Sequence, residues 1–224
     1  MSIGPGETSE TRTEVSRSSS AIDMLGLLTV LAIAPSILLM ATCFTRFVIV
    51  LAFVRQAIGV QHTPPNQVLI GLALFLTAFV MQPVADEVID LAYDPYVAGE
   101  MTGHEALEEA AEPVRRFLLS QTREEDLALF VEMAKVGPLA EPADVPLTTL
   151  LPSFLVSELR TAFEIGFVIF LPFLIIDLIV SSLLISMGMI VLPPIVVSLP
   201  FKIMLFVLAD GWNLILGSLV QGML

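Results

Sequence analysis

Four long runs of apolar residues constrain this chain more than any other feature. They cover residues 24–54, 68–85, 165–190 and 195–219, each near or above the roughly 18 residues that make a membrane-spanning helix a candidate. Backbone polar groups in lipid must bond within their own segment, so such runs form helices. The alternative is a set of core helices in a soluble protein, but a 24.3 kDa chain offers too little polar surface to wrap four of them.

The composition agrees with this interpretation and argues against nucleic acid as a partner. Hydrophobic residues make up 56% of the 224 residues and charged residues only 15%, whereas a soluble domain carries about a quarter charged residues. The net charge is −13, and phosphate binding requires a basic surface. The single cysteine, Cys43, cannot form an internal disulfide and is expected to be a small buried apolar residue.

The sequence divides into four segments within an expected all-α fold. Residues 1–23 are polar and predict a disordered tail. Residues 24–92 predict an apolar helical hairpin, with a loop at the Pro-Pro pair 64–65. Residues 93–147 hold most of the acidic residues and predict a helical insertion outside the cytoplasm, and residues 148–224 predict a second apolar hairpin. Basic residues near the short turns place those turns on the cytoplasmic side.

Within the insertion, local signals predict where two helices begin. Pro113 is expected to start one of them, since proline suits a first helical turn. Thr122 and Glu125 have the spacing of a capping box, which predicts the start of the next helix.

No catalytic or metal-binding constellation stands out. His62 and His104 lie in different regions without metal-ligand spacing, and no phosphate loop or dinucleotide motif is present. We therefore expect no enzyme activity, no cofactor and no metal. Asp177 interrupts an apolar run, where charge is costly. It predicts either a proton-coupling site of a solute or ion transporter or, as we favour, a hydrogen-bonded contact in an oligomer. Arg160 and Glu164 are four residues apart and are expected to pair along one helix face.

An apolar turn precedes the Pro-Pro pair at 193–194 and consists of Met187, Gly188, Met189 and Ile190. Methionine is flexible and polarizable and can repack around changing contents, and glycine allows a sharp bend. Taken alone, the turn is best interpreted as ordinary packing at a helix end.

Several segments of the chain resemble the FliP family of flagellar export-gate proteins, which has counterparts in virulence type III secretion systems. The matching segments in the C-terminal half are 157–167 (SELRTAFEIGF), 170–177 (FLPFLIID), 187–189 (MGM) with 193–194 (PP), 199–202 (LPFK) and 205–212 (LFVLADGW). In the N-terminal half they are 45–47 (TRF) and 71–77 (GLALFLT). The likeness runs from about residue 25 to residue 219.

The resemblance implies a role that composition alone does not. Members of this family form a ring-like or helical oligomer, usually with five copies of this subunit together with Q-type and R-type export proteins. The assembly lies in the inner membrane within the flagellar basal body and passes unfolded flagellar proteins.

The resemblance also assigns roles to particular residues. It implies a pore gasket at Met187, Gly188, Met189 and Ile190, and inter-subunit polar contacts at Glu158, Arg160, Asp177, Lys202 and Asp210.

Overall fold

The computed structural model describes residues 24–60 except 27 and 30, and then residues 63–135, 144–189 and 192–223. It contains two compact units, Met1–Leu39 and Met40–Leu224. In the first unit the described residues from Met24 onward are helical, and large apolar side chains such as Leu28 and Leu31 are exposed. The predicted tail at 1–23 lies outside the described residues.

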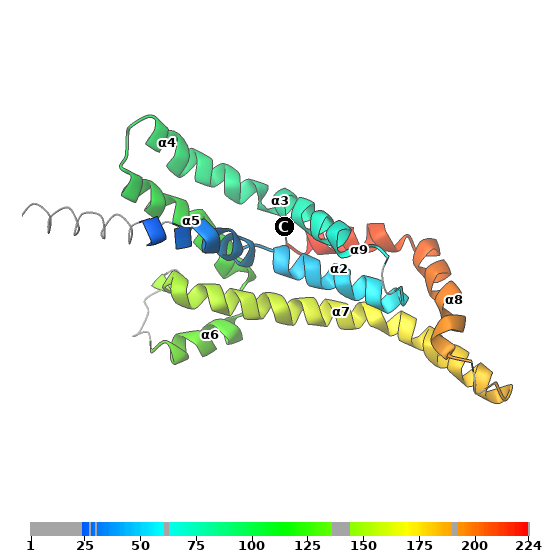
Figure 1. The fold of residues 1–224 in the computed structure, drawn as a ribbon. Coiled ribbons are helices and arrows are strands. Elements are labelled where there is room, and N and C mark those ends of the chain that lie inside the picture. Colours follow the sequence, from blue (N-terminus) through cyan, green and yellow to red (C-terminus); the bar gives the residue numbers. More distant parts are fainter. Residues whose placement is uncertain are drawn as a thin grey trace, which may run out of the picture. The chain divides into compact units, whose positions relative to one another are not determined.

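The described residues of the second unit form helices joined by short connections, which confirms the all-α prediction for that part of the chain (Figure 1). The helices are α2 (Phe44–Ile58), α3 (Asn66–Val88), the π-helical turn η1 (Ile89–Tyr93), α4 (Asp94–Val97), α5 (Gly103–Gln121), α6 (Glu124–Met133), α7 (Leu147–Ser186), α8 (Pro194–Leu208) and α9 (Gly211–Gln221). Helical backbone continues without a loop from α3 to α4, across the predicted segment boundary at 92–93. The segment boundaries stay predictions.

Helix α2 lies at the centre of the main core. Phe47, Val50, Leu51 and Val54 are fully buried, and their cluster includes residues of α3, α7, α8 and α9. Cys43 belongs to this cluster as well, as its sequence context predicts. Among the described helices, α2 packs most extensively on α7. The two helices lie side by side in Figure 1, although about a hundred residues separate them in sequence.

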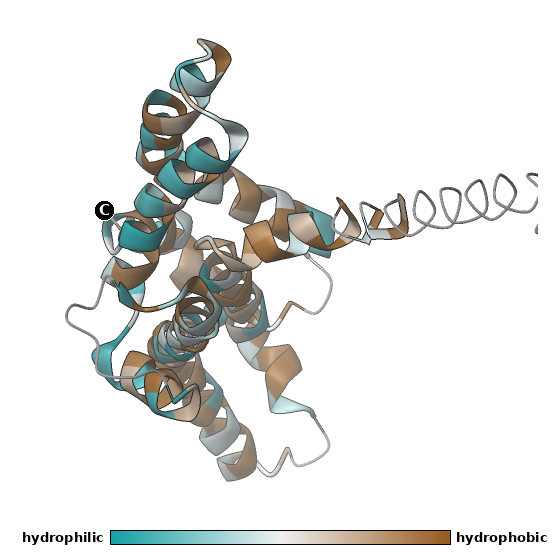
Figure 2. Cartoon of the chain, turned by 90° about the vertical axis from the view of Figure 1, so that its left-hand side faces the viewer, coloured by the Kyte–Doolittle hydropathy of each residue, from teal (hydrophilic) through white to brown (hydrophobic). Residues whose placement is uncertain are grey.

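A second, smaller core joins the acidic insertion to the beginning of α7. Leu118 of α5 is fully buried together with Leu150 and Phe154 of α7. Leu127 and Val131 of α6 pack against them. Hydrophilic residues gather toward the α4–α5 end of the molecule in Figure 2, while most other helices are strongly hydrophobic. The insertion therefore packs with one apolar face on α7 and leaves its charged face exposed.

The prediction that Pro113 starts a helix is wrong. α5 runs from Gly103 to Gln121 with Pro113 buried inside it. A capping box starts this helix ten residues earlier, because the Thr102 hydroxyl accepts from the Glu105 N–H while the Glu105 carboxylate accepts from the Thr102 N–H at 2.7 Å. With its N-terminus capped there, the helix tolerates the one hydrogen bond that an interior proline removes.

A helix begins near Thr122 as predicted, because α6 begins at Glu124, but the capping box predicted at Thr122 and Glu125 is wrong. The Thr122 hydroxyl donates to the carbonyl of Leu118 at 2.6 Å, and α6 begins after Arg123 without a side-chain cap. Arg160 of α7 binds the Glu125 carboxylate at 3.1 Å. A tertiary ion pair therefore replaces the local capping bond that the spacing suggests.

The count of four long apolar helices is supported in part. Two helical segments, Asn66–Val97 and Leu147–Ser186, are long and apolar enough to cross a membrane. The count rises to four if two broken pairs each form one span, namely Met24–Met40 with Phe44–Ile58 and Pro194–Leu208 with Gly211–Gln221. The predicted first run is interrupted at 41–43, and the predicted last run bends by 60° around 209–210.

Candidate functional site

The predicted gasket lies where α7 ends and the chain turns toward α8. The Gly188 N–H donates to the carbonyl of Ile185 at 3.0 Å, and the Met189 N–H donates to that of Leu184 at 2.9 Å. These two bonds form a Schellman motif, which requires a left-handed residue after the helix. Gly188 supplies it with φ +72°. The glycine therefore has a definite backbone role in shaping the loop.

The side chains of this loop are apolar and largely uncovered by the rest of the chain. Met187 is 71% exposed and Met189 is 38% exposed, while Ile190 lies outside the described residues. In Figure 1 the α7–α8 hairpin extends past the end of α2, with the loop at its tip. Beside Met187, an apolar groove of about 420 Å³ follows α7 and α8, lined by Ile176, Ile179, Val180, Leu183, Leu184, Val197 and Phe201. The loop presents flexible apolar side chains at the end of a projecting hairpin.

A polar cluster ties this hairpin to α2. Lys202 of α8, 4% exposed, places its Nζ 2.6 Å from Asp177 Oδ2 of α7 and 3.2 Å from the Ala57 carbonyl of α2. The Ser198 hydroxyl donates to Asp177 Oδ1 at 2.6 Å. An ammonium at a helix C-terminus is also favoured by the helix dipole. Both Asp177 oxygens and the buried ammonium are thus satisfied within the chain.

A second ion pair lies near the beginning of α2. Arg46 binds Glu158 of α7 through two hydrogen bonds, one from Nε at 3.0 Å and one from Nη2. The same Nη2 donates to Gln121 Oε1 of α5 at 3.4 Å. Glu158 is fully buried and Arg46 is 6% exposed. This contact therefore connects α2, α5 and α7 inside an otherwise apolar core.

Arg160 and Arg123 extend the polar contacts toward the surface. The predicted pairing of Arg160 with Glu164 is confirmed at 3.6 Å, and Arg160 also contacts Asp126 at 3.7 Å. Arg123, which sequence reasoning missed, donates to Glu164 at 3.0 Å, and this carboxylate raises the pKa of Arg123 above its ordinary value. In the sequence, the signal for these contacts is the run of charged residues at 123–126.

Asp210 lies in the break between α8 and α9. It adopts the left-handed conformation with φ +50°, and its Oδ2 accepts from the Asn213 amide at 3.1 Å. The predicted inter-subunit residues Glu158, Arg160, Asp177 and Lys202 likewise have partners within the chain. Their contacts between subunits stay a prediction.

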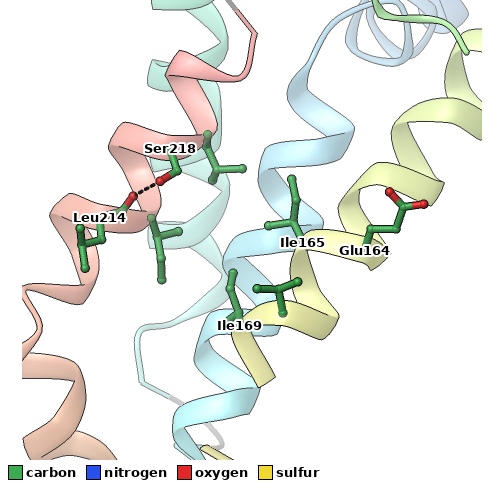
Figure 3. A pocket seen from close by; sticks show the side chains of 8 residues that line it. Glu164, Ile165, Ile169, Leu214 and Ser218 are labelled. Carbon is green, nitrogen blue, oxygen red and sulfur yellow. Dashed lines mark hydrogen bonds between the residues drawn. The ribbon is translucent and has the colours of Figure 1, made fainter. Parts of the chain in front are cut away.

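A further apolar groove of about 440 Å³ separates α7 from α9 (Figure 3). Ile165 and Ile169 on α7 line it opposite Leu214 and Ser218 on α9. The Ser218 hydroxyl is bonded to the Leu214 carbonyl of its own helix at 2.7 Å, so it presents little free polarity to the groove. Among the described residues, no three His, Cys, Asp or Glu side chains gather as metal ligands would.

Comparison with known proteins gives the same assignment along most of the chain. The model of the FliP family matches residues 27–219. The flagellar biosynthetic protein FliP of Bacillus subtilis is 55% identical over 203 residues, covering 91% of this chain and 92% of its own. The protein of the same name from Pectobacterium carotovorum is 55% identical, covering 90% and 78%. That of Aquifex aeolicus is 50% identical, covering 90% and 85%. The resemblance predicted from the sequence motifs is confirmed, and the chain belongs to the FliP family.

Proposed function

We propose that this chain is a structural and gating subunit of a flagellar protein-export channel. As a member of the FliP family it is a protein of flagellar biosynthesis, and its apolar helices are consistent with membrane association. In the proposed role it lies in the inner membrane as a multi-pass protein of the basal body. It lines the passage through which unfolded flagellar proteins leave the cell and performs no chemistry of its own.

The exposed loop of Met187, Gly188 and Met189 is the observation that carries this proposal. An apolar side chain that is 71% exposed at the tip of a hairpin has little reason to lie there in an isolated subunit. Repeated around a symmetric oligomer, such loops would meet at the axis and form a deformable plug. Methionine suits this task because its unbranched side chain repacks around contents of changing shape.

The uncovered face of α7 supports an oligomer. Phe167, Leu171, Leu174 and Leu178 recur every three or four residues along this helix, and each is between 43% and 68% exposed. This spacing places them on one side of the helix. A continuous apolar stripe of this kind indicates contact with lipid or with another protein. We assign it to neighbouring subunits, namely further copies of this chain and the Q-type and R-type proteins.

The rival role, a proton-coupled transporter with Asp177 as the coupling group, is disfavoured by the local geometry. Asp177 is bonded to both Lys202 and Ser198. Both carboxylate oxygens of Asp177 therefore already accept hydrogen bonds within the chain. The same contacts suit a residue that fixes the position of the hairpin.

Replacing Met187 and Met189 together by alanine tests the plug. We expect cells with this variant to show increased permeability to ions or small solutes, while the assembly still forms. Met133→Ala is the matched control, because Met133 is also largely exposed, at 67%, but lies on α6. Normal export combined with unchanged permeability in the double variant would refute the gasket role.

Co-purification tests the partners. We expect the full-length chain, extracted in mild detergent, to elute in one large complex with the Q-type and R-type proteins. A stable monomer that elutes without them would contradict the proposed assembly.

A further inference from the structure

The connection between α5 and α6 contacts α7 mainly through polar groups. The Arg123 N–H donates to Ser157 Oγ at 3.1 Å, and that hydroxyl donates to Asp126 Oδ2 at 2.8 Å. The Arg123 guanidinium binds Glu164. The contact residues on α7 follow helical spacing, so the turn lies along one strip of that helix.

Beside this strip, on the buried side of α7, lies the contact of Arg46, Glu158 and Gln121. Gln121 is the last residue of α5, so Arg46 bonds to both sides of the interface, the α5 side through Gln121 and the α7 side through Glu158. A guanidinium bound to a carboxylate through two parallel hydrogen bonds is strongly directional. Apolar contacts, in contrast, are non-directional.

A shift of α7 by one helical turn shows what this contact excludes. Such a shift brings Phe154 or Ala162 to the place of Glu158, and both residues are fully buried and apolar. Arg46 would then face an apolar side chain while Glu158 remained without its charge partner. An uncompensated buried charge is strongly unfavourable. The ion pair therefore discriminates between registers on chemical grounds, whereas the apolar neighbours discriminate only by size.

We propose that the Arg46–Glu158–Gln121 contact is a register lock that holds α2 and the α5–α6 turn at a single position along α7. Its contribution is to the uniqueness of packing rather than to the free energy of unfolding, since replacing a buried ion pair by apolar residues is often neutral or stabilising. The lock acts within one subunit and goes beyond the proposed role in export. It makes Arg46, Glu158 and Gln121 positioning residues.

Hydrogen–deuterium exchange on the purified full-length chain tests the lock. In the double variant Arg46→Met with Glu158→Leu, we expect the thermal midpoint to stay close to that of the native chain. Amides in 119–127 should nevertheless exchange about tenfold faster, because local opening sets exchange rates. Native exchange in this double variant would overturn the proposal, since apolar packing alone would then fix the register.

If the double variant does not accumulate, two single Arg→Lys variants test the register lock. Arg46→Lys keeps the charge but loses the two-pronged contact, and we expect faster exchange in 119–127. Arg116→Lys makes the same substitution on α5, where Arg116 forms an exposed ion pair with Glu87 of α3, and should leave these amides unchanged. Equal exchange in the two variants would overturn the lock. The measurement is independent of export, so its outcome is separate from that of the proposed function.

Discussion

A tight contact between α2 and α7 gives a test of the fold. Gly166 of α7 is buried beneath Phe53 of α2, and a Cβ at this position would stand 2.4 Å from Phe53 Cδ2. The ring cannot move away freely, because it also packs edge-on against Phe163 and Phe170 at centroid distances of 5.3 and 6.0 Å. Gly166→Ala therefore forces either the helices apart or the ring out of its aromatic contacts.

The magnitude follows from these contacts. Overpacking a tight core costs about 1–3 kcal/mol. For a chain of this size, a loss of 1–3 kcal/mol lowers the thermal midpoint by about 2–12 °C. We expect Gly166→Ala to lower the midpoint of the detergent-solubilised chain by an amount in this range.

Two further variants control this experiment. Gly71→Ala lies inside α3, where an added Cβ meets nothing within 4 Å, and should be neutral or stabilise by about 0.5–1 kcal/mol. Phe53→Leu combined with Gly166→Ala should recover part of the loss, because contacting residues are not additive. A Gly166→Ala chain as stable as the native one would show that α2 and α7 do not approach this closely.

Three other predictions use single changes. Asp177→Asn leaves the buried Lys202 ammonium without its charge partner and should cost about 1–3 kcal/mol, measured as a lower thermal midpoint, because the Asp177 side chain is 37% exposed and solvent screens the pair; a midpoint equal to the native one would contradict the ion pair. Gly188→Ala places a side chain in the left-handed conformation and should cost about 1–2 kcal/mol, with faster amide exchange at the end of α7; unchanged exchange would argue against the Schellman motif. The bond from the Thr102 N–H lowers the pKa of Glu105 below its ordinary value, so the contribution of this carboxylate to the start of α5 is present above the ordinary glutamate pKa and is lost as the pH falls through the lowered native pKa. Amide exchange of the first α5 turn should accelerate in acid in the native chain, and Glu105→Gln should remove this pH dependence.

The apolar runs predict helices well, because a backbone away from water must have its polar groups hydrogen-bonded and a helix achieves this within one segment. Their breaks were harder to locate. In the break between α8 and α9, Asp210 adopts the left-handed conformation, which aspartate tolerates better than most residues. The turn at 41–43 carries no glycine or proline, so a pattern of hydrophobicity could not reveal it.

The capping box predicted at Thr122 and Glu125 is wrong for a different reason. Threonine followed three residues later by glutamate occurs at both Thr102 and Thr122, and only the first forms a capping box. Arg160, which lies 35 residues after Glu125, decides the outcome by binding that carboxylate. A competition between a local bond and a distant one cannot be judged from spacing alone.

The buried charges show a further limit of prediction from the sequence. Arg46, Asp177 and Lys202 each lie inside an apolar run of the sequence, but their partners can be assigned only in three dimensions. Arg46 lies 112 residues from Glu158, and Lys202 lies 25 residues from Asp177. Since these pairs satisfy each other within one chain, a neighbouring subunit does not have to supply their countercharges. What the chain leaves unsatisfied is apolar surface, along α7 and at the loop that follows it. In the proposed assembly, association through these faces depends on shape and burial rather than on charge, and such contacts can slide and repack while the proposed register lock fixes the helices within each subunit.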